Sequence, residues 1–289
     1  MHTTTISYKS KNILIEKLEK QSNIEVIKAK SFFSKLFSKK QHADIYFHTG
    51  SLNEKSIDNI KNSKITIVNS FSAKNEIVES TKIKDEKIEI IYPSINIDFK
   101  EPNKVKAKIC EEFQIDLETK LIFFTAKNIK SSGVKEFLDI CASLNYENFK
   151  IIISASQKQI NNLQFQLPKY EGLKDKLIIL EDYKNIDDLF LASDIFILPT
   201  HNKSFSSNIL KAMFCKCVVF VTIQNEVKEV VDVFASMDNP SDSTISFKLD
   251  AILSAENDLK EIKEQNRKLA LEFTLENNLV KINHIMENV

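Results

Sequence analysis

The sequence predicts an α/β fold made of two domains, each built on a parallel β-sheet with helical crossovers. Short runs of β-branched residues alternate with longer helical stretches along the chain. Several of these runs, such as Ile195–Leu198, are continuously apolar, which is typical of strands buried on both faces. The alternation breaks once, at Ser94–Asn103, which follows Pro93 and contains Pro102. Because proline interrupts regular structure, we place the domain boundary there.

The first domain is predicted over residues 1–95. Its expected strands are Thr4–Tyr8, Ile24–Lys28, Asp44–His48, Ile65–Asn69 and Lys87–Tyr92. The helices expected between them are Asn12–Glu19, Ser31–Ser38, Glu54–Lys61 and Ala73–Glu79. A strand that is followed by a helix and another strand favours a parallel pair, because the helix carries the chain back across the sheet.

The second domain is predicted over residues 96–272 and repeats the same scheme. Its expected strands are Lys120–Thr125, Lys150–Ser154, Lys176–Leu180, Ile195–Leu198 and Val218–Val221. Its expected helices are Val134–Leu144, Gln157–Gln164, Asn185–Ala192 and Ser207–Cys215. The stretch Asn257–Val289 is predicted to be helical, with no strand after it.

Composition excludes several classes of protein. With 289 residues, 43% hydrophobic residues and a formal net charge of +0, the chain is too apolar and too balanced to be disordered. Its 4 cysteines are too few for a disulfide scaffold and are predicted to be buried in a reduced cytosol. We find no signal peptide, no spanning segment, no metal-ligand cluster and no nucleic-acid motif, so we expect a cytoplasmic protein without metal or cofactor.

Glycine is scarce, since the chain has only 3 glycines. Average usage of about 7% would give roughly twenty. A phosphate site in this chain therefore cannot depend on many glycine-rich turns. Residues 1–90 contain 16 lysines against 11 acidic residues, an excess of +5, which favours an anionic surface or substrate for that half.

One segment, SFFSKLFSKK at residues 31–40, combines aromatic and basic side chains at helical spacing. The apolar face contains Phe32, Phe33 and Phe37, and the flanking lysines include Lys35, Lys39 and Lys40. Such a helix could lie on an anionic membrane surface, which would make the protein peripheral to the membrane. It could equally pack its apolar face on the core and leave the lysines in water.

Seven segments, in order, carry a family resemblance. They are Ile65–Glu79, Ile90–Phe99, Ile122–Ala142, Lys176–Thr200, Phe205–Val219, Glu229–Val231 and Phe273–Ile285. Together they resemble glycosyltransferase family 4, the group 1 transferases of GT-B fold. The resemblance implies two Rossmann-like domains, the first on the acceptor side and the second on the donor side. It also implies that the helix at residues 273–289 packs back on the first domain.

The same resemblance implies an activity. Members of that family transfer a sugar from a nucleotide-sugar to an acceptor, retain the anomeric configuration and need no metal. Their Glu-x7-Glu motif contacts the sugar and accepts hydrogen bonds from the ribose diol. In this chain the two motif positions are Lys203 and Lys211. An ammonium group has three donors and no acceptor, so neither lysine can replace those carboxylates.

Three interpretations of these lysines stay open. With Lys127 and Lys130, which follow a predicted strand, they could bind phosphate groups of a remodelled donor site. Alternatively, the donor site has been lost, and the protein is an inactive relative that partners an active glycosyltransferase or binds a glycan. In the third, Glu226 or Glu229 replaces the missing carboxylates.

The remaining candidates come from the resemblance or from positions at strand ends. Gly133 matches a family glycine, and His201 follows a predicted strand where ligands commonly bind in α/β sheets. Ser206 and Ser207 begin the next helix, with Ser207 as the expected N-cap, and the backbone N–H groups there could hold a phosphate. His48 and Glu229 are the candidate catalytic residues, although a lone histidine is more often structural.

Overall fold

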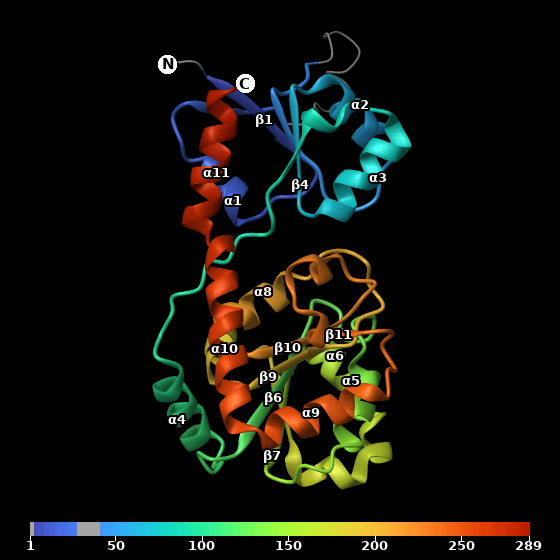
Figure 1. Ribbon diagram of the computed structural model, residues 1–289, viewed down its shortest axis with the longest axis vertical. Helices are drawn as coiled ribbons and strands as arrows, with labels where there is room; N and C mark the ends of the chain where they lie inside the picture. Colours follow the sequence, from blue (N-terminus) through green and yellow to red (C-terminus); the bar gives the residue numbers. More distant parts are fainter. Residues whose placement is uncertain (1–2, 28–40) are drawn as a thin grey trace. The chain divides into compact units, whose positions relative to one another are not determined.

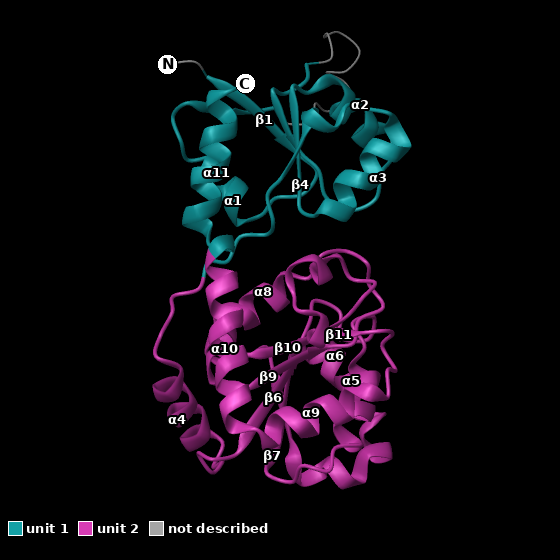
Figure 2. Ribbon diagram, viewed as in Figure 1, with its two compact units in different colours: residues 1–96, 272–289 teal, residues 97–271 magenta. Residues whose placement is uncertain are grey.

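The computed structural model describes residues 3–27 and 41–289. The chain forms two compact units (Figure 2). Unit 1 comprises residues 1–96 and 272–289, and unit 2 comprises residues 97–271. Each unit contains its own β-sheet, and all strand pairs in both sheets are parallel. The prediction of an α/β fold with two parallel sheets is confirmed.

Unit 1 is built on a five-stranded sheet with the order β2-β1-β3-β4-β5. Its strands are β1 (Thr4–Tyr8), β2 (Ile24–Val26), β3 (Ile45–Phe47), β4 (Ile65–Val68) and β5 (Ile88–Ile90). The helices between them include α1 (Ile13–Leu18), α2 (Glu54–Asn62) and α3 (Phe71–Thr81). Each of these helices begins after a side-chain cap, because Asn12, Asn53 and Ser70 accept hydrogen bonds from backbone N–H groups of the first turn.

The last helix of the chain, α11 (Leu275–Glu287), also belongs to unit 1 and lies beside α1 (Figure 1). Leu275 and Ile282 are buried in the same apolar cluster as residues of β1, β3 and β4. The backbone N–H of Ile95 donates to the carbonyl of Phe273 at 2.8 Å, and the N–H of Leu275 donates to the carbonyl of Ile95 at 2.8 Å. Helix α11 therefore completes the core of unit 1 from the far end of the sequence.

Unit 2 is built on a six-stranded sheet with the order β11-β10-β9-β6-β7-β8. Its strands are β6 (Lys120–Thr125), β7 (Phe149–Ala155), β8 (Leu177–Glu181), β9 (Ile195–Leu198), β10 (Val218–Thr222) and β11 (Ser236–Met237). Its α-helices are α4 (Pro102–Glu112), α5 (Val134–Ala142), α6 (Gln157–Gln164), α7 (Ile186–Ala192), α8 (Ser207–Phe214), α9 (Thr244–Ser254) and α10 (Glu256–Ala270). Among its 3-10 turns are η3 (Leu167–Lys176) and η4 (Glu226–Val230).

Aromatic residues of β6 fill both faces of this sheet. Consecutive residues of a strand point to opposite faces, so Phe123 and Phe124 enter different layers. Phe123 packs edge-on against Phe190 of α7 and Phe196 of β9, with ring centroids 5.0 and 5.7 Å apart. Phe124 stacks on Phe137 of α5 at 4.9 Å. Each of these rings is buried, which contributes about 1.5–3 kcal/mol per side chain and holds helices against both faces.

Two α-helices and one strand of unit 2 were not predicted, namely α4, α9 and β11. Helix α4 begins at Pro102, inside the stretch expected to be a linker. Proline suits the first turn of a helix, because the N–H that it lacks would have no partner there. The side chain of Glu101 caps the same turn by accepting a hydrogen bond from the N–H of Asn103 at 3.1 Å.

The helix predicted at Ser31–Ser38 lies outside the described residues, together with its proposed membrane-facing side chains Phe32, Phe33, Lys35, Phe37, Lys39 and Lys40. Within the described ranges, no helix is long and apolar enough to cross a bilayer. All four cysteines are buried and free, as expected.

Candidate functional site

The connectivity of unit 2 creates a switch point between β6 and β9. From β6 the chain moves outward through β7 to β8, and then returns to the other side of β6 to form β9, β10 and β11. The loops that leave the carboxyl ends of β6 and β9 therefore turn in opposite directions. Ligands of open α/β sheets commonly bind at such a place.

The loop after β6 is held close to the loop after β9 at Gly133. This residue has a φ of +85°, and a Cβ atom placed on it would lie only 1.8 Å from the carbonyl oxygen of Pro199. Any side chain here would therefore clash with backbone, besides adopting an unfavourable left-handed conformation. Glycine is needed at this position because two backbones meet.

The side chain of Gln159, on α6, shapes the rest of the β6 loop. Its Oε1 accepts a hydrogen bond from the N–H of Ile129 at 2.7 Å, and its Nε2 donates to the carbonyl of Lys127 at 3.2 Å. Ile129 is buried, whereas Lys127 and Lys130 on either side of it are exposed. The loop is thus anchored at its centre, with both lysines in solvent.

The loop after β9 is tied to the β6 loop by hydrogen bonds. The N–H of His201 donates to the carbonyl of Ser131 at 3.3 Å, and Nδ2 of Asn202 donates to the same carbonyl at 3.2 Å. The imidazole of His201 is about half exposed, and its Nε2 lies 3.3 Å from Oε1 of Glu136 on α5. His201 is therefore placed at the predicted strand end, where a carboxylate already contacts its ring.

Asn225 fixes the β9 loop from the other side and is only 1% exposed. Its Oδ1 accepts from the N–H groups of Ser206 and Val227, at 3.2 and 3.1 Å. Its Nδ2 donates to the carbonyls of Asn202 and Ser204, at 2.9 and 2.8 Å. A buried amide with every donor and acceptor used holds the surrounding backbone in one arrangement.

Helix α8 begins beside these loops. Its N-cap is Ser206 and not Ser207, which is the first helical residue, so the predicted cap is wrong by one position. Helix ends are the least certain part of a sequence-based prediction. The side chain of Ser206 makes no capping hydrogen bond, and the first-turn N–H groups are therefore not satisfied by it. Such groups favour an anion at this end of the helix.

The candidate lysines fall into two classes. Lys127, Lys130 and Lys203 are exposed, and none makes an ion pair within residues 3–27 and 41–289. Lys211 is half-buried on α8, and its Nζ lies 3.7 Å from Oδ1 of Asp187 on α7. The charge of Lys211 is thus already matched, whereas the other three remain available to a ligand.

A comparison with protein-family models supplies the decisive observation. The model described as glycosyl transferases group 1 matches residues 105–269, which is more than half of the chain.

The chain belongs to the group 1 glycosyltransferases.

Solved structures share the fold of this group 1 glycosyltransferase. A glycosyltransferase from Rickettsia africae ESF-5 is 16% identical with a TM-score of 0.73, over 99% of this chain and 90% of that one. WaaG, a glycosyltransferase involved in lipopolysaccharide biosynthesis, is 11% identical with a TM-score of 0.68, over 97% and 98%. Anabaena Alr3699/HepE in complex with UDP-glucose is 14% identical with a TM-score of 0.69, over 85% and 72%. No curated protein matches in a sequence comparison. At these identities the likeness establishes a GT-B fold.

The two catalytic candidates lie in different units. Glu229 is half-buried in η4 of unit 2. His48 follows β3 of unit 1 and is only 3% exposed. Burial, and to a smaller extent the charge of Lys9, lowers the pKa of His48 to about 4. Its imidazole is therefore neutral at physiological pH.

Sequence reasoning missed the amides that build the site. Gln159, Asn202 and Asn225 hold the two loops through side-chain contacts with residues 19 to 71 positions away. A possible signal was their position, since Asn202 and Asn225 each follow a predicted strand by a few residues. No group of three or more metal-ligating side chains occurs in the described part of the chain.

Proposed function

We propose that this chain is a glycosyltransferase whose nucleotide-sugar donor binds unit 2 at the carboxyl ends of β6 and β9. Membership of group 1 supports the reaction class. The choice of donor is supported by the fold neighbour Alr3699/HepE, whose structures are described as complexes with UDP and with UDP-glucose. By analogy with the family, transfer would retain the anomeric configuration and require no metal.

The observation that carries the proposal is the set of unmatched cations at this edge. Lys127, Lys130 and Lys203 are exposed without acidic partners, and the uncapped start of α8 lies in the same loop cluster. When the bond between the sugar and the diphosphate breaks, negative charge develops on the departing phosphate. Ammonium groups and helix N–H groups placed there in advance would stabilise that charge.

The donor would be held mainly through its phosphates. At the two positions where family members have carboxylates, this chain has Lys203 and Lys211, which cannot accept hydrogen bonds from a ribose diol. Lys211 is also occupied by Asp187. We therefore expect the ribose to contribute less to donor affinity than in other family members, and the diphosphate to contribute more. Glu229 and His48 remain the candidates for accepting the acceptor's proton.

A second function, a catalytically inactive subunit, is favoured by the same substitutions. Replacing both family carboxylates by lysines, one of them paired with Asp187, removes the acceptor groups that the family uses. Such a protein would bind a glycan or assemble with an active glycosyltransferase.

Calorimetric titration with UDP, GDP and their sugar conjugates, with hydrolysis followed in parallel, separates the two functions. The enzyme proposal expects micromolar binding of one nucleotide, weakened about tenfold in Lys127→Ala, because one cation contact contributes about 1.4 kcal/mol. Lys108→Ala, an exposed lysine of α4, is the matched control and should bind like the parent. Absence of binding up to millimolar nucleotide would favour the inactive subunit.

Attachment to an anionic membrane on the cytoplasmic side stays a separate proposal, because residues 31–40 are not described. Co-sedimentation with liposomes containing anionic lipid tests it. The Phe33→Ser, Phe37→Ser double variant should lose binding if these rings enter the bilayer surface. Binding that the double variant retains, and that salt alone removes, would contradict it.

A further inference from the structure

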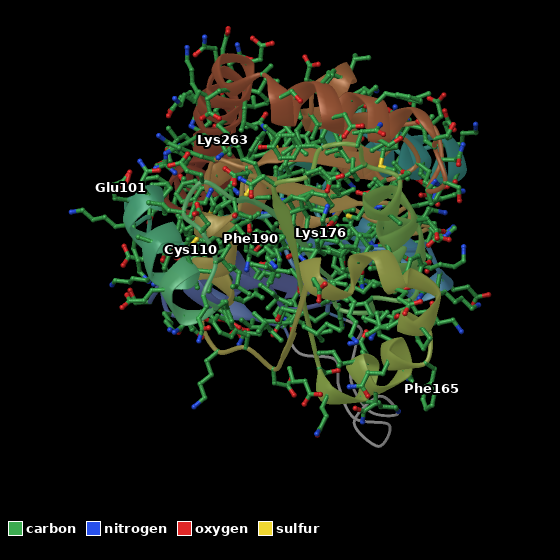
Figure 3. The ribbon with its side chains drawn as sticks, turned by 90° about the horizontal axis from the view of Figure 1, so that it is seen from below. Glu101, Cys110, Phe165, Lys176, Phe190 and Lys263 are labelled. Atoms are coloured by element: carbon green, nitrogen blue, oxygen red, sulfur yellow. The ribbon has the colours of Figure 1, made fainter. Side chains whose placement is uncertain are left out.

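A hollow of about 560 Å³ lies at the amino-terminal edge of the sheet of unit 2, opposite the candidate donor site. Lys120 begins β6, Asp194 directly precedes β9, and Lys216 lies two residues before β10. Helices α4 and α10 line the hollow, and Figure 3 shows Glu101, which directly precedes α4, and Lys263 of α10 on the same side of the structure. With strands of four to six residues at about 3.3 Å each, the two edges are roughly 13 to 20 Å apart.

Lysines dominate the inner wall of this hollow. Lys106, Lys120 and Lys263 expose only 14%, 13% and 21% of their side chains. Lys106 and Lys263 both contact the buried carboxylate of Asp194, at 3.0 and 2.6 Å. Oδ2 of Asp194 also accepts a hydrogen bond from the N–H of Leu121, at 2.9 Å. Two half-buried cations thus share one anion.

Glu256, at the start of α10, also contacts two lysines, Lys120 at 2.6 Å and Lys260 at 3.6 Å, but it is about half exposed. Lys216 and Glu264 form a balanced pair at 2.5 Å. The whole lining holds five lysines and five carboxylates, but Glu101, Glu118 and Lys260 are exposed, where water and salt screen their charge. On the inner wall, Glu256 balances Lys120, and Asp194 is shared by Lys106 and Lys263, which leaves an excess of one positive charge.

An excess of half-buried positive charge is costly unless an anion matches it. The ammonium groups also have hydrogen-bonding capacity left. Each has three donors, and in the part of the chain that the structure describes Lys106, Lys120 and Lys263 each donate to a single carboxylate oxygen. A ligand with several acceptor oxygens and a negative charge would satisfy both requirements.

We propose that this hollow binds the phosphate group of a small phosphorylated molecule. A phosphate monoester carries about −1.5 to −2 charges at neutral pH, which is enough to match the single excess positive charge on the inner wall. Lysine binds phosphate as a point charge, without the fixed geometry that arginine needs. The volume lies within the range of about 300–1,000 Å³ that is usual for small-molecule sites. This site is independent of the proposed donor site, since the two share no residue.

Calorimetric titration of the full chain with inorganic phosphate and with glycerol 3-phosphate, at constant ionic strength, tests the proposal. The background is the Lys127→Ala, Lys203→Ala double variant, which removes cations of the opposite edge. One binding site should remain there. Tighter binding of the ester indicates a phosphorylated small molecule, and equal binding indicates that the phosphate group alone is recognised.

Lys263→Met is the decisive variant. It leaves Lys106 and Asp194 as a balanced pair, so we expect it to fold and to bind phosphate at least about tenfold more weakly. Lys268→Met is the matched control, because Lys268 is on the same helix, is exposed and does not line the hollow. It makes the same change in net charge and should leave binding unchanged.

A labelling experiment on the parent protein does not depend on how the variants fold. Glycerol 3-phosphate should slow the acetylation of Lys260, which is 69% exposed at the hollow, and should not slow that of Lys268. Three results would overturn the proposal: no binding of either probe up to about 10 mM, equal weakening in Lys263→Met and Lys268→Met, or equal labelling with and without ligand. Binding of polyglutamate but of neither phosphate probe would also overturn it, by assigning the surface to an acidic protein.

Discussion

The two edges of the sheet in unit 2 use lysine in opposite ways. At the carboxyl edge, Lys127 and Lys203 are exposed on loops and have no acidic partner in the described ranges. At the amino edge, Lys106 and Lys263 are mostly buried and share the carboxylate of Asp194. The carboxyl edge is held by packed backbone and by side-chain amides, whereas the amino edge is held by charge.

This difference shows that the cost of burying a charge decides what a lysine can do. Leaving an exposed lysine unpaired costs little free energy, because water solvates its charge, so the ammonium group stays available to a ligand. A buried lysine must be matched, so its removal or the removal of its partner changes the stability of the fold. Variants at the two edges should therefore affect different measurements, and the following predictions run from the largest expected change in stability to the smallest.

Asp194→Asn should produce the largest loss. It leaves Lys106 and Lys263 buried without a counter-charge, which should lower the free energy of unfolding by about 3–5 kcal/mol. Urea denaturation followed by circular dichroism measures this loss. The control is Glu147→Gln, whose carboxylate is 86% exposed in its pair with Lys176 and should contribute less than about 1 kcal/mol. Equal losses in the two variants would remove the contrast between buried and exposed pairs.

Gly133→Ala should produce the next largest loss. The added Cβ would meet the carbonyl of Pro199, and the residue would keep a positive φ, so we expect a cost of about 3 kcal/mol and loss of nucleotide binding. Gly50→Ala is the control, since Gly50 also has a positive φ, +68°, but has open space around it. That variant should cost only about 1–2 kcal/mol, from backbone conformation alone.

Acid should weaken the amino edge through Asp194. Burial alone would raise the pKa of its carboxyl, but Lys263 and Lys106 outweigh that effect and hold the pKa below the usual 3.8. Because the pKa is lower in the folded state, this stabilisation is fully present above pH 3.8 and is lost as the pH falls below it. Urea midpoints measured between pH 6 and pH 2.5, an interval of about 3.5 pH units chosen to span the titration, should therefore fall more steeply in the parent than in Asp194→Asn.

Lys216→Gly should separate folding from binding at the amino edge. Lys216 follows α8 with a φ of 64°, which costs a non-glycine residue about 1 kcal/mol. Glycine should recover about 0.5–1 kcal/mol of stability and weaken phosphate binding a few-fold. Gln114→Gly is the control, because Gln114 has a φ of 55° but does not line the hollow. It should be stabilised similarly, with unchanged phosphate binding.

Lys203→Ala should have the smallest effect on stability, within about 0.5 kcal/mol, because its side chain is exposed. Its effect on nucleotide affinity should nevertheless be about tenfold if the ammonium contacts the diphosphate. Thermal unfolding with and without UDP measures both quantities on one sample. A large loss of stability without ligand would place Lys203 in the same class as the amino-edge lysines.

Much of the fold could be predicted from periodicity. The described strands β1 and β6 have the predicted bounds, and the apolar runs of β6, β9 and β10 are buried on both faces. Strand β11 escaped prediction because it has only two residues, and such a strand forms through its neighbour β10, not through its own sequence. Helix α4 was not predicted because Pro102, which begins this helix, was interpreted as part of a linker.

The candidate site could be predicted only in part. His201 was proposed because it follows a strand, and Gly133 because it matches a family glycine. The shared carboxylate of Asp194 could not be found, because its partners Lys106 and Lys263 lie 88 and 69 residues away in the sequence. Neither spacing nor residue type indicates such a triad. The three come together only because residues of α4 and α10 both reach the start of β9.

The position of α11 has a consequence for how the molecule is made. The strands of unit 1 are synthesised first, but Leu275 and Ile282, which complete its core, are synthesised after the whole of unit 2. Until then, apolar residues such as Ile6 and Leu14 lack part of their cover. Domains usually fold as they emerge during translation, the N-terminal one first. Here this order is reversed: unit 1, whose synthesis begins first, can complete its core only after unit 2 has been synthesised.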